Sequence, residues 1–189
     1  RMPQGLRKVE RSIEMENDLE RRRRFIDSVV GTYEGMVSDV RGNEGPIRFI
    51  ITSSFPRLPE SHRSRSIEEI SYELTNLYLN VQVIEWSTIN ESAEIAFGCV
   101  YEQVRPNIVD GALHLMSKEC KMGYALFSAE LVPNAQIPTS SRSDMKVSKV
   151  LASDVVDGKL MDIPAFVGRK QSNLSSKRVP LRVKKVASQ

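Results

Sequence analysis

Features that commonly reveal a catalytic function are scarce in this chain of 189 residues. It contains two histidines, His62 and His114, whereas a metal site needs three or four convergent ligands. Cys120 and His114 lie six residues apart without the pattern of a nucleophile and its base. No glycine-rich phosphate loop is present. We therefore expect no catalytic residue, no metal and no cofactor, and we favour a non-enzymatic protein.

Cysteine is also scarce. The two cysteines, Cys99 and Cys120, do not form a Cys-x-x-Cys pair. Cys99 lies in an apolar, strand-like segment, and Cys120 lies in a turn-like segment. If the strands around them pair, a disulfide is geometrically feasible. Two unrelated thiols fit the sequence equally well, so the cysteines leave the redox environment open.

Long apolar runs are missing. No segment approaches the roughly 20 residues that a membrane-spanning helix needs, so we expect no transmembrane segment. The chain begins with Arg1-Met2-Pro3, which is typical of a processed or trimmed start. An export signal or a lipid-bearing cysteine could have preceded it. We therefore favour an exported or envelope-associated protein.

Acidic residues are absent from the end of the chain, although the net charge of the whole is only +3. The basic tail after Gly168 contains Arg169, Lys170, Lys177, Arg178, Arg182, Lys184 and Lys185. Such a tail is either a solvated end or a surface for peripheral contact with an anionic membrane or with phosphate groups. Nucleic acid is the less favoured partner, because such binding uses interleaved aromatic side chains and the tail has only Phe166 beside it.

Residues 1–30 are predicted to form a helical lead. Leu6, Val9 and Ile13 follow a spacing of three and four residues, which is typical of one face of a helix. Gly31 is a natural stop for this helix. The apolar row is thin, so we expect the helix to pack on a larger body rather than to form a core by itself.

Residues 31–132 change to an apolar period of two, which indicates β-strands. Seven strand candidates begin near residues 33, 47, 70, 81, 95, 113 and 124, with turn-forming residues between them. No helical crossover separates them, so neighbouring strands should be antiparallel. The sequence therefore predicts a mainly β fold, an antiparallel up-and-down β-barrel, with a β-sandwich as the alternative.

Three features of this region allow more than one interpretation. Ile67–Leu79 alternates like a strand, which we favour, but four of its apolar residues also fit a helical period. Pro56–Ser66 is a polar loop, long enough to form a rim or lid. The acids Glu85, Glu91, Glu94 and Glu102 are interpreted as a solvated outer face.

The end of the chain is predicted to follow the barrel region as a linker and a C-terminal extension. Residues 133–144 form a linker rich in proline, serine and threonine. Residues 145–189 form a C-terminal extension with edge strands, because Ile163-Pro164 and Pro180 interrupt its apolar runs. The sequence leaves open whether this extension completes the barrel or wraps around its outside.

The start of the β region resembles that of lipocalin-like (calycin-type) barrels. In that family a helical lead precedes Gly-x-Trp in the first strand, and here Gly31-Thr32-Tyr33 stands in the same place. The resemblance covers these residues and the strand count over 32–132, and the later packing arginine of the family has no counterpart that we can place. The resemblance implies a barrel with one closed end and one open end, which holds a small apolar ligand.

Aromatic residues at alternating positions are the candidates for the barrel interior. The predicted ligand-binding residues are Tyr33, Phe49, Tyr72, Phe97, Tyr101 and Tyr124. The same side chains could instead fill a small barrel completely. Both interpretations are open at this point.

Three functions are compatible with the sequence. The leading one is a non-enzymatic protein that carries a small apolar molecule or a lipid chain, taken up near Pro56–Ser66. The alternative is a structural or assembly protein that docks on a protein or an anionic surface through its helix, its outer sheet face or its basic tail. The third is an enzyme on the same scaffold, with a glutamate, His114 or a tyrosine in the cavity.

Overall fold

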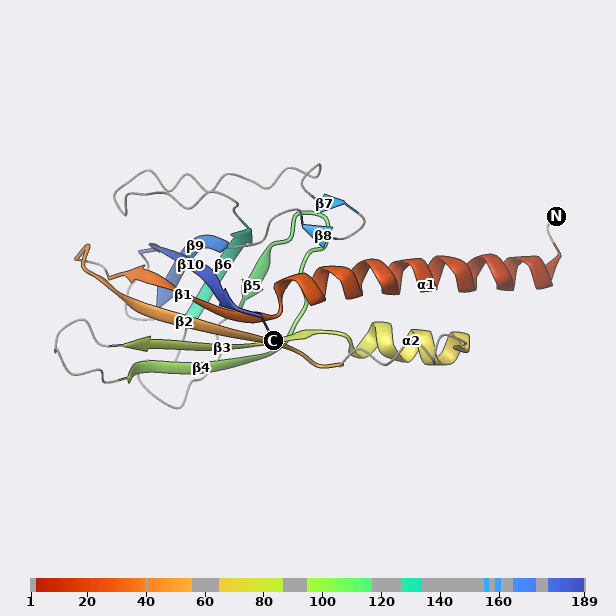
Figure 1. Ribbon diagram of the computed structural model, residues 1–189, viewed down its shortest axis with the longest axis horizontal. Helices are drawn as coiled ribbons and strands as arrows, with labels where there is room; N and C mark the ends of the chain where they lie inside the picture. Colours follow the sequence, from red (N-terminus) through yellow and green to blue (C-terminus); the bar gives the residue numbers. More distant parts are fainter. Residues whose placement is uncertain are drawn as a thin grey trace.

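The predicted mainly β fold is confirmed by a computed structural model of the chain. The structure describes residues 3–39, 41–55, 65–86, 95–116, 127–133, 155–156, 159–160, 165–172 and 177–188. Within these residues the chain forms an antiparallel, up-and-down and nearly closed β-barrel of eight strands, preceded by a long helix (Figure 1).

The described elements follow one another along the chain in a simple order. The helices are α1 (Gln4–Val29) and α2 (Ile67–Asn76). The barrel strands are β1 (Gly31–Ser38), β2 (Glu44–Ser53), β3 (Leu79–Trp86), β4 (Ile95–Val104), β5 (Leu113–Leu115), β6 (Phe127–Pro133), β9 (Ala165–Ser172) and β10 (Val179–Ala187). The short strands β7 (Val155–Val156) and β8 (Lys159–Leu160) pair with each other in a separate ribbon.

The order of the strands in the sheet shows how the barrel closes. That order is β4-β3-β2-β1-β10-β9-β6-β5. The first and last strands of the chain are therefore neighbours, and Tyr33 on β1 stands opposite Lys185 on β10. The remaining seam lies between β4 and β5, which are consecutive in the chain and contact each other. Each pairing along this order is antiparallel.

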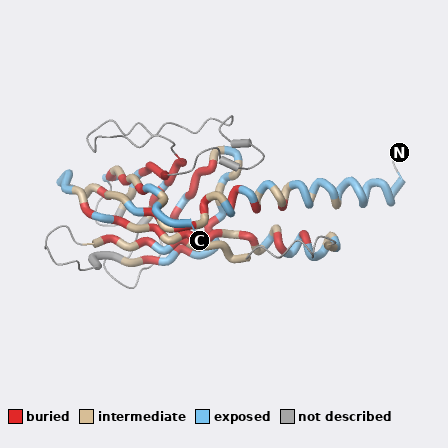
Figure 2. Tube along the Cα trace, viewed as in Figure 1, coloured by how far each residue is buried: buried red, intermediate tan, exposed pale blue. Residues whose placement is uncertain are grey.

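Helix α1 covers one end of the barrel, which we call the closed end. Phe25, Ile26 and Val29 in its last turns are buried and belong to the same hydrophobic cluster as Tyr33 and Phe49 of the strands. The first turns of α1 extend away from the barrel and are exposed (Figure 2). The opposite end, where β1 stops at Ser38 and β3 stops at Trp86, is called the far end.

Two pairs of neighbouring strands, β1 with β10 and β9 with β6, approach each other closely at a glycine. A Cβ atom at Gly35 would overlap the backbone carbonyl of Arg182, and one at Gly168 would overlap that of Glu130. Any larger residue would push the adjacent strand away. Glycine in these strands therefore permits the close backbone approach that a small, strongly bent barrel needs.

The strand predicted over Ile67–Leu79 is wrong in its first ten residues. They form α2, and only Leu79 begins a strand, β3. Ser66 caps this helix, because its side chain accepts a hydrogen bond of 3.2 Å from the backbone N–H of Glu69. The acids Glu68 and Glu69 in the first turn favour the helix dipole. The helical period and the cap together outweigh the alternation that suggested a strand.

The C-terminal strands lie in the middle of the sheet and not at its edge. β10 pairs with β1 on one side and with β9 on the other, so these two strands complete the barrel. Pro180 is tolerated because pairing with β1 ends at Leu181. The part of the predicted basic tail that the structure describes, including Arg182 and Lys185, is mostly regular strand.

Several sequence predictions lie outside the described residues. They are the linker after Pro133, the body of the loop between Pro56 and Ser66, and the residues Tyr124 and Cys120. The ends of that loop are described. Phe55 and Arg65 lie beside α1, because Arg23 of α1 hydrogen-bonds to the Phe55 carbonyl and shares Glu73 with Arg65.

Candidate functional site

The closed end of the barrel is filled by large apolar side chains. Tyr33 and Phe166 are both fully buried, and the centroids of their rings lie 5.2 Å apart. The Tyr33 hydroxyl donates a hydrogen bond of 2.8 Å to the Val29 carbonyl of α1. Burial raises the pKa of Tyr33 well above its usual range, so this hydroxyl stays a donor. The packing and the hydrogen bond together join the first strand to the covering helix.

Lys185 supports the same end from β10. Its Nζ donates a hydrogen bond of 3.2 Å to the Ser28 carbonyl in the last turn of α1. A cation at this position is favourable for the helix dipole. Burial lowers the pKa of Lys185. The contact brings the end of the chain against the end of its first helix.

The predicted ligand-binding residues separate into three groups. Tyr33, Phe49 and Tyr101 are buried and belong to the core cluster. Phe97 lies in β4 opposite Glu85, but its side chain is not among those described, as is also the case for Tyr124. For these residues a role in ligand binding stays a prediction.

Tyr72 does not line the barrel. It lies on α2 and is 63% exposed, so its predicted inward position is wrong. The cause is the change from strand to helix, which places Tyr72 on the opposite face from the buried Ile70 and Glu73. Its ring instead stands at the edge of Phe55, with the centroids 6.1 Å apart.

An ion pair crosses the interior of the barrel. Lys170 Nζ on β9 lies 2.5 Å from Oε1 and 2.6 Å from Oε2 of Glu85 on β3. The side chains are 17% and 9% exposed. In the sheet order three strands separate β3 from β9 in one direction, and three separate them across the seam in the other. The two residues therefore come from opposite walls.

Glu85 corrects the sequence interpretation of the acids as a solvated outer face. It follows Leu79, Val81 and Val83 at a spacing of two, and all four are buried. This inward row was visible in the sequence and could have identified Glu85. Lys170 could not be found in the same way, because its strand was interpreted as part of a basic tail.

Tyr101 lies on β4, which is adjacent to the strand β3 that carries Glu85. It is buried on β4, where it pairs with Val81. Burial and then the negative charge of Glu85 raise the pKa of Tyr101 well above its usual range. The hydroxyl therefore stays protonated. Glu85, Lys170 and Tyr101 thus form a polar group within an otherwise apolar barrel.

Cys99 lies on the same wall and is buried. It is disulfide-bonded. Cys120, the other cysteine of the chain, lies outside the described residues. The disulfide favours the first of the two interpretations that the sequence left open for Cys99.

A second buried ion pair lies outside the barrel, between the two helices. Arg23 Nε of α1 donates a hydrogen bond of 2.7 Å to Glu73 of α2. Arg65 also pairs with Glu73, and another Arg23 nitrogen donates to the Phe55 carbonyl. The Arg23 guanidinium lies over the Phe55 ring, 5.9 Å from its centroid. This network fixes α2 against α1, which is a structural role.

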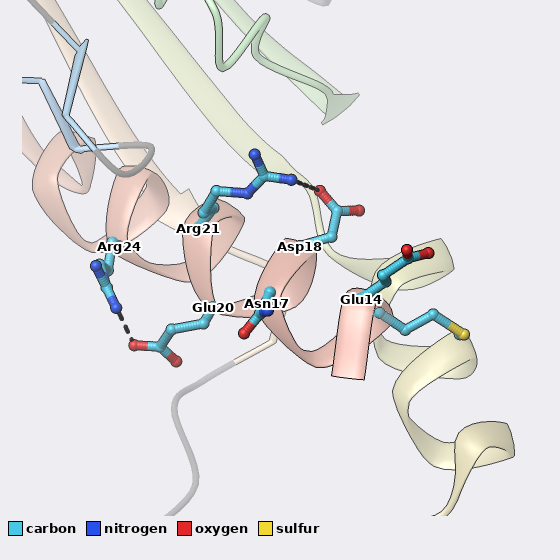
Figure 3. Close-up of a pocket in the computed structure, with 7 residues that line it drawn as sticks. Glu14, Asn17, Asp18, Glu20, Arg21 and Arg24 are labelled. Atoms are coloured by element: carbon cyan, nitrogen blue, oxygen red, sulfur yellow. Dashed lines mark hydrogen bonds and ion pairs between the residues drawn. The ribbon is translucent and has the colours of Figure 1, made fainter. Parts of the chain in front are cut away.

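The two hollows described next are open, and charged side chains form part of their lining. One hollow of about 800 Å³ lies on α1. Figure 3 shows that it contains the ion pairs Arg21–Asp18 and Arg24–Glu20. A smaller one, about 260 Å³, includes His114 and Glu130 on strands β5 and β6. These hollows lie on the exterior, so neither of them is a ligand site inside the barrel.

Further chemistry is limited within the described part of the chain. No group of three or more histidine, cysteine or acidic side chains there could hold a metal ion. None of the helices described is long and apolar enough to cross a membrane. Comparison with protein-family models, curated proteins and solved structures finds no match for this chain. The function must therefore be argued from the geometry.

Proposed function

We propose that this protein is a non-enzymatic, lipocalin-like binding protein whose barrel takes up one small apolar or lipid molecule. The observation that carries the proposal is a nearly closed barrel with an apolar inner face and a helix across one end. Small barrels of eight strands either are filled by side chains or hold a single small ligand.

We place the entry at the far end. At the closed end, Phe25, Ile26 and Val29 of α1 are buried beneath the strands. The described ends of the Pro56–Ser66 loop lie beside α1, so this loop is the less favoured entrance. The ligand would rest above Tyr33, with its apolar part toward the closed end.

The disulfide at Cys99 supports an exported or envelope-associated location. Disulfides persist in oxidising compartments and are rare in reducing ones. Together with the barrel, this favours a carrier that works outside the cytosol.

Binding is tested with N-phenyl-1-naphthylamine, a neutral apolar probe that fluoresces in apolar surroundings, together with native mass spectrometry of the purified protein. We expect saturable fluorescence with one probe per monomer, or a small molecule already bound in the mass spectrum. Phe49→Trp, which enlarges a fully buried side chain, should reduce probe binding. A bare monomer that gives no saturable fluorescence would overturn the carrier function.

A second candidate function is assembly through α1. Leu6, Val9 and Ile13 are each more than half exposed. At 3.6 residues per turn this row lies about 120° around the helix from Leu19 and Ile26, which pack on the body of the protein. The row therefore belongs to a face that the fold does not use. Its spacing matches a short coiled-coil seam.

The occupant of this face that the charges favour is a second copy of α1 in the antiparallel direction. Residues 7–11 carry three bases and one acid, whereas residues 14–20 carry four acids and no base. An antiparallel pair centred on Ile13 places residues 7–11 opposite residues 15–19, so unlike charges meet, whereas a parallel pair opposes like charges. Light scattering after size exclusion should show a dimer that becomes a monomer in Leu6→Ser/Val9→Ser/Ile13→Ser. A monomeric wild-type protein would remove this candidate.

A further inference from the structure

The ion pair Glu85–Lys170 is unusual in its position. Both residues lie near the far end, since Glu85 is the penultimate residue of β3 and Lys170 is the third from the end of β9. The apolar cluster around Tyr33 and Phe166 lies between them and α1. A molecule that enters from the far end therefore meets the ion pair before it meets the apolar interior.

Stability alone does not account for this pair. Removing two charges from water costs several kcal/mol for each ion, and apolar replacements of similar size are often neutral or stabilising. Val81 and Val83 occupy the inward positions just before Glu85 on the same strand. The sheet itself thus accepts apolar residues at neighbouring sites. A polar pair inside this barrel therefore indicates recognition of a polar group.

The charge balance of the pair limits what it can recognise. Lys170 offers an ammonium with three donors, and Glu85 offers two acceptor oxygens. A ligand with a single charge would separate the pair and leave one buried charge without a counter-ion, which is strongly unfavourable. A ligand that brings one charge of each sign satisfies both residues and keeps the site neutral.

From this placement we propose that Glu85 and Lys170 bind the head group of a small zwitterionic amphiphile, with Lys170 on its negative group and Glu85 on its positive group. This inference rests on the proposed carrier function and names its ligand class. Tyr101 lies on the adjacent strand β4 opposite Val81, further from the far end than Glu85, and its ring provides an aromatic surface on the same wall for a cationic group. The apolar body of the ligand lies toward Phe166.

The test uses isothermal titration calorimetry to compare four probes that each carry an eight-carbon chain. They are octylphosphocholine, octanoate, octyltrimethylammonium and octanol, all used below their micelle concentrations. We expect the wild-type protein to bind octylphosphocholine about tenfold more tightly than octanol. The zwitterion makes two charge-assisted contacts with the ion pair, whereas octanol makes none. The singly charged probes should bind more weakly than octylphosphocholine.

Two double variants separate the ion pair from the barrel that holds it. Glu85→Leu/Lys170→Met should fold, bind octanol as well as the wild type does, and lose about tenfold in affinity for octylphosphocholine. Glu85→Lys/Lys170→Glu keeps one charge of each sign and serves as the matched control. It should retain a preference for the zwitterion over octanol. Thermal unfolding followed by circular dichroism verifies that both variants are folded.

The outcomes distinguish the two proposals. If octanol binds but octylphosphocholine has no advantage, or keeps its advantage in Glu85→Leu/Lys170→Met, the head-group site is wrong and the carrier function survives. If the wild-type protein prefers octanoate or octyltrimethylammonium, the proposal of a zwitterionic ligand is also wrong. If none of the four probes and no N-phenyl-1-naphthylamine binds, both proposals fail together.

Discussion

Two buried ion pairs in the described part of the chain lie in different surroundings. Arg23–Glu73 lies between two helices outside the barrel, where Arg65 and the Phe55 carbonyl also participate. Glu85–Lys170 lies inside the barrel and joins opposite walls. The first pair holds α2 in place on α1. The second faces the barrel interior, where we propose that it binds a ligand, so the proposal assigns similar chemistry to structure in one place and to recognition in the other.

The ends of the barrel differ in the same sense. At the closed end, apolar side chains of α1 continue the core, and hydrogen bonds from Tyr33 and Lys185 attach the helix to the strands. Toward the far end, the inward row of β3 changes from valine to Glu85. The change from apolar to polar along one strand distinguishes the end anchored to α1 from the end where we propose that a ligand enters.

The largest expected effect is on the filled closed end. Phe49→Ala removes a fully buried ring and should lower the free energy of unfolding by about 3–5 kcal/mol. Tyr72→Ala, at the exposed aromatic residue on α2, is the matched control and should change it by less than about 0.5 kcal/mol. Urea unfolding followed by tryptophan fluorescence measures both. Equal losses would contradict the assignment of inner and outer aromatic residues.

The next effect tests the structural ion pair. Glu73→Ala removes the buried carboxylate that pairs with both Arg23 and Arg65 and should lower the free energy of unfolding by about 3 kcal/mol. Arg23→Met/Glu73→Leu removes both charges and should lie much closer to the wild type. Probe affinity should stay unchanged in the double variant, because the pair lies outside the barrel. A loss of probe binding in the double variant would contradict the assignment of a purely structural role to Arg23–Glu73.

A pH dependence tests the hydrogen bond at the closed end. The folded state raises the pKa of Tyr33 above its ordinary value of 10.0, so above about pH 10 the unfolded chain releases a proton that the native state keeps. Stability is therefore full below pH 10 and falls as the pH rises further, by up to about 1.4 kcal/mol per pH unit for this group. Tyr33→Phe should show a shallower fall in urea unfolding between pH 9 and 11. An identical slope would mean that Tyr33 ionises freely.

The smallest effect is expected on the projecting part of α1. Leu6→Ser and Val9→Ser should each change the free energy of unfolding by less than about 0.5 kcal/mol, because both side chains are mostly exposed. Leu19→Ser, on the packed face of the same helix, is the contrast and should cost at least about 2 kcal/mol. Thermal unfolding at low protein concentration measures the monomer alone. A large loss for Leu6→Ser would show that this row packs on the fold.

The sequence predicted the barrel because local period and turn residues determine strands directly. It missed what depends on distant contacts. Tyr72 was misplaced because ten residues satisfied both a strand and a helix pattern, and the Ser66 cap with the Arg23–Glu73 pair decides for the helix. Only one residue of the site could be predicted from the sequence. Glu85 continues an inward row of β3, whereas Lys170 reaches it from a strand 85 residues away.

The pairing of β1 with β10 has a consequence for how the chain folds. Residues near 33 and near 185 must find each other before the barrel exists, and contacts between such distant segments slow folding. A chain synthesised only through β6 has two unpaired sheet edges, and exposed edges promote aggregation. The protein is therefore most vulnerable late in its synthesis, and loss of its last ten residues should be more harmful than loss of its first ten.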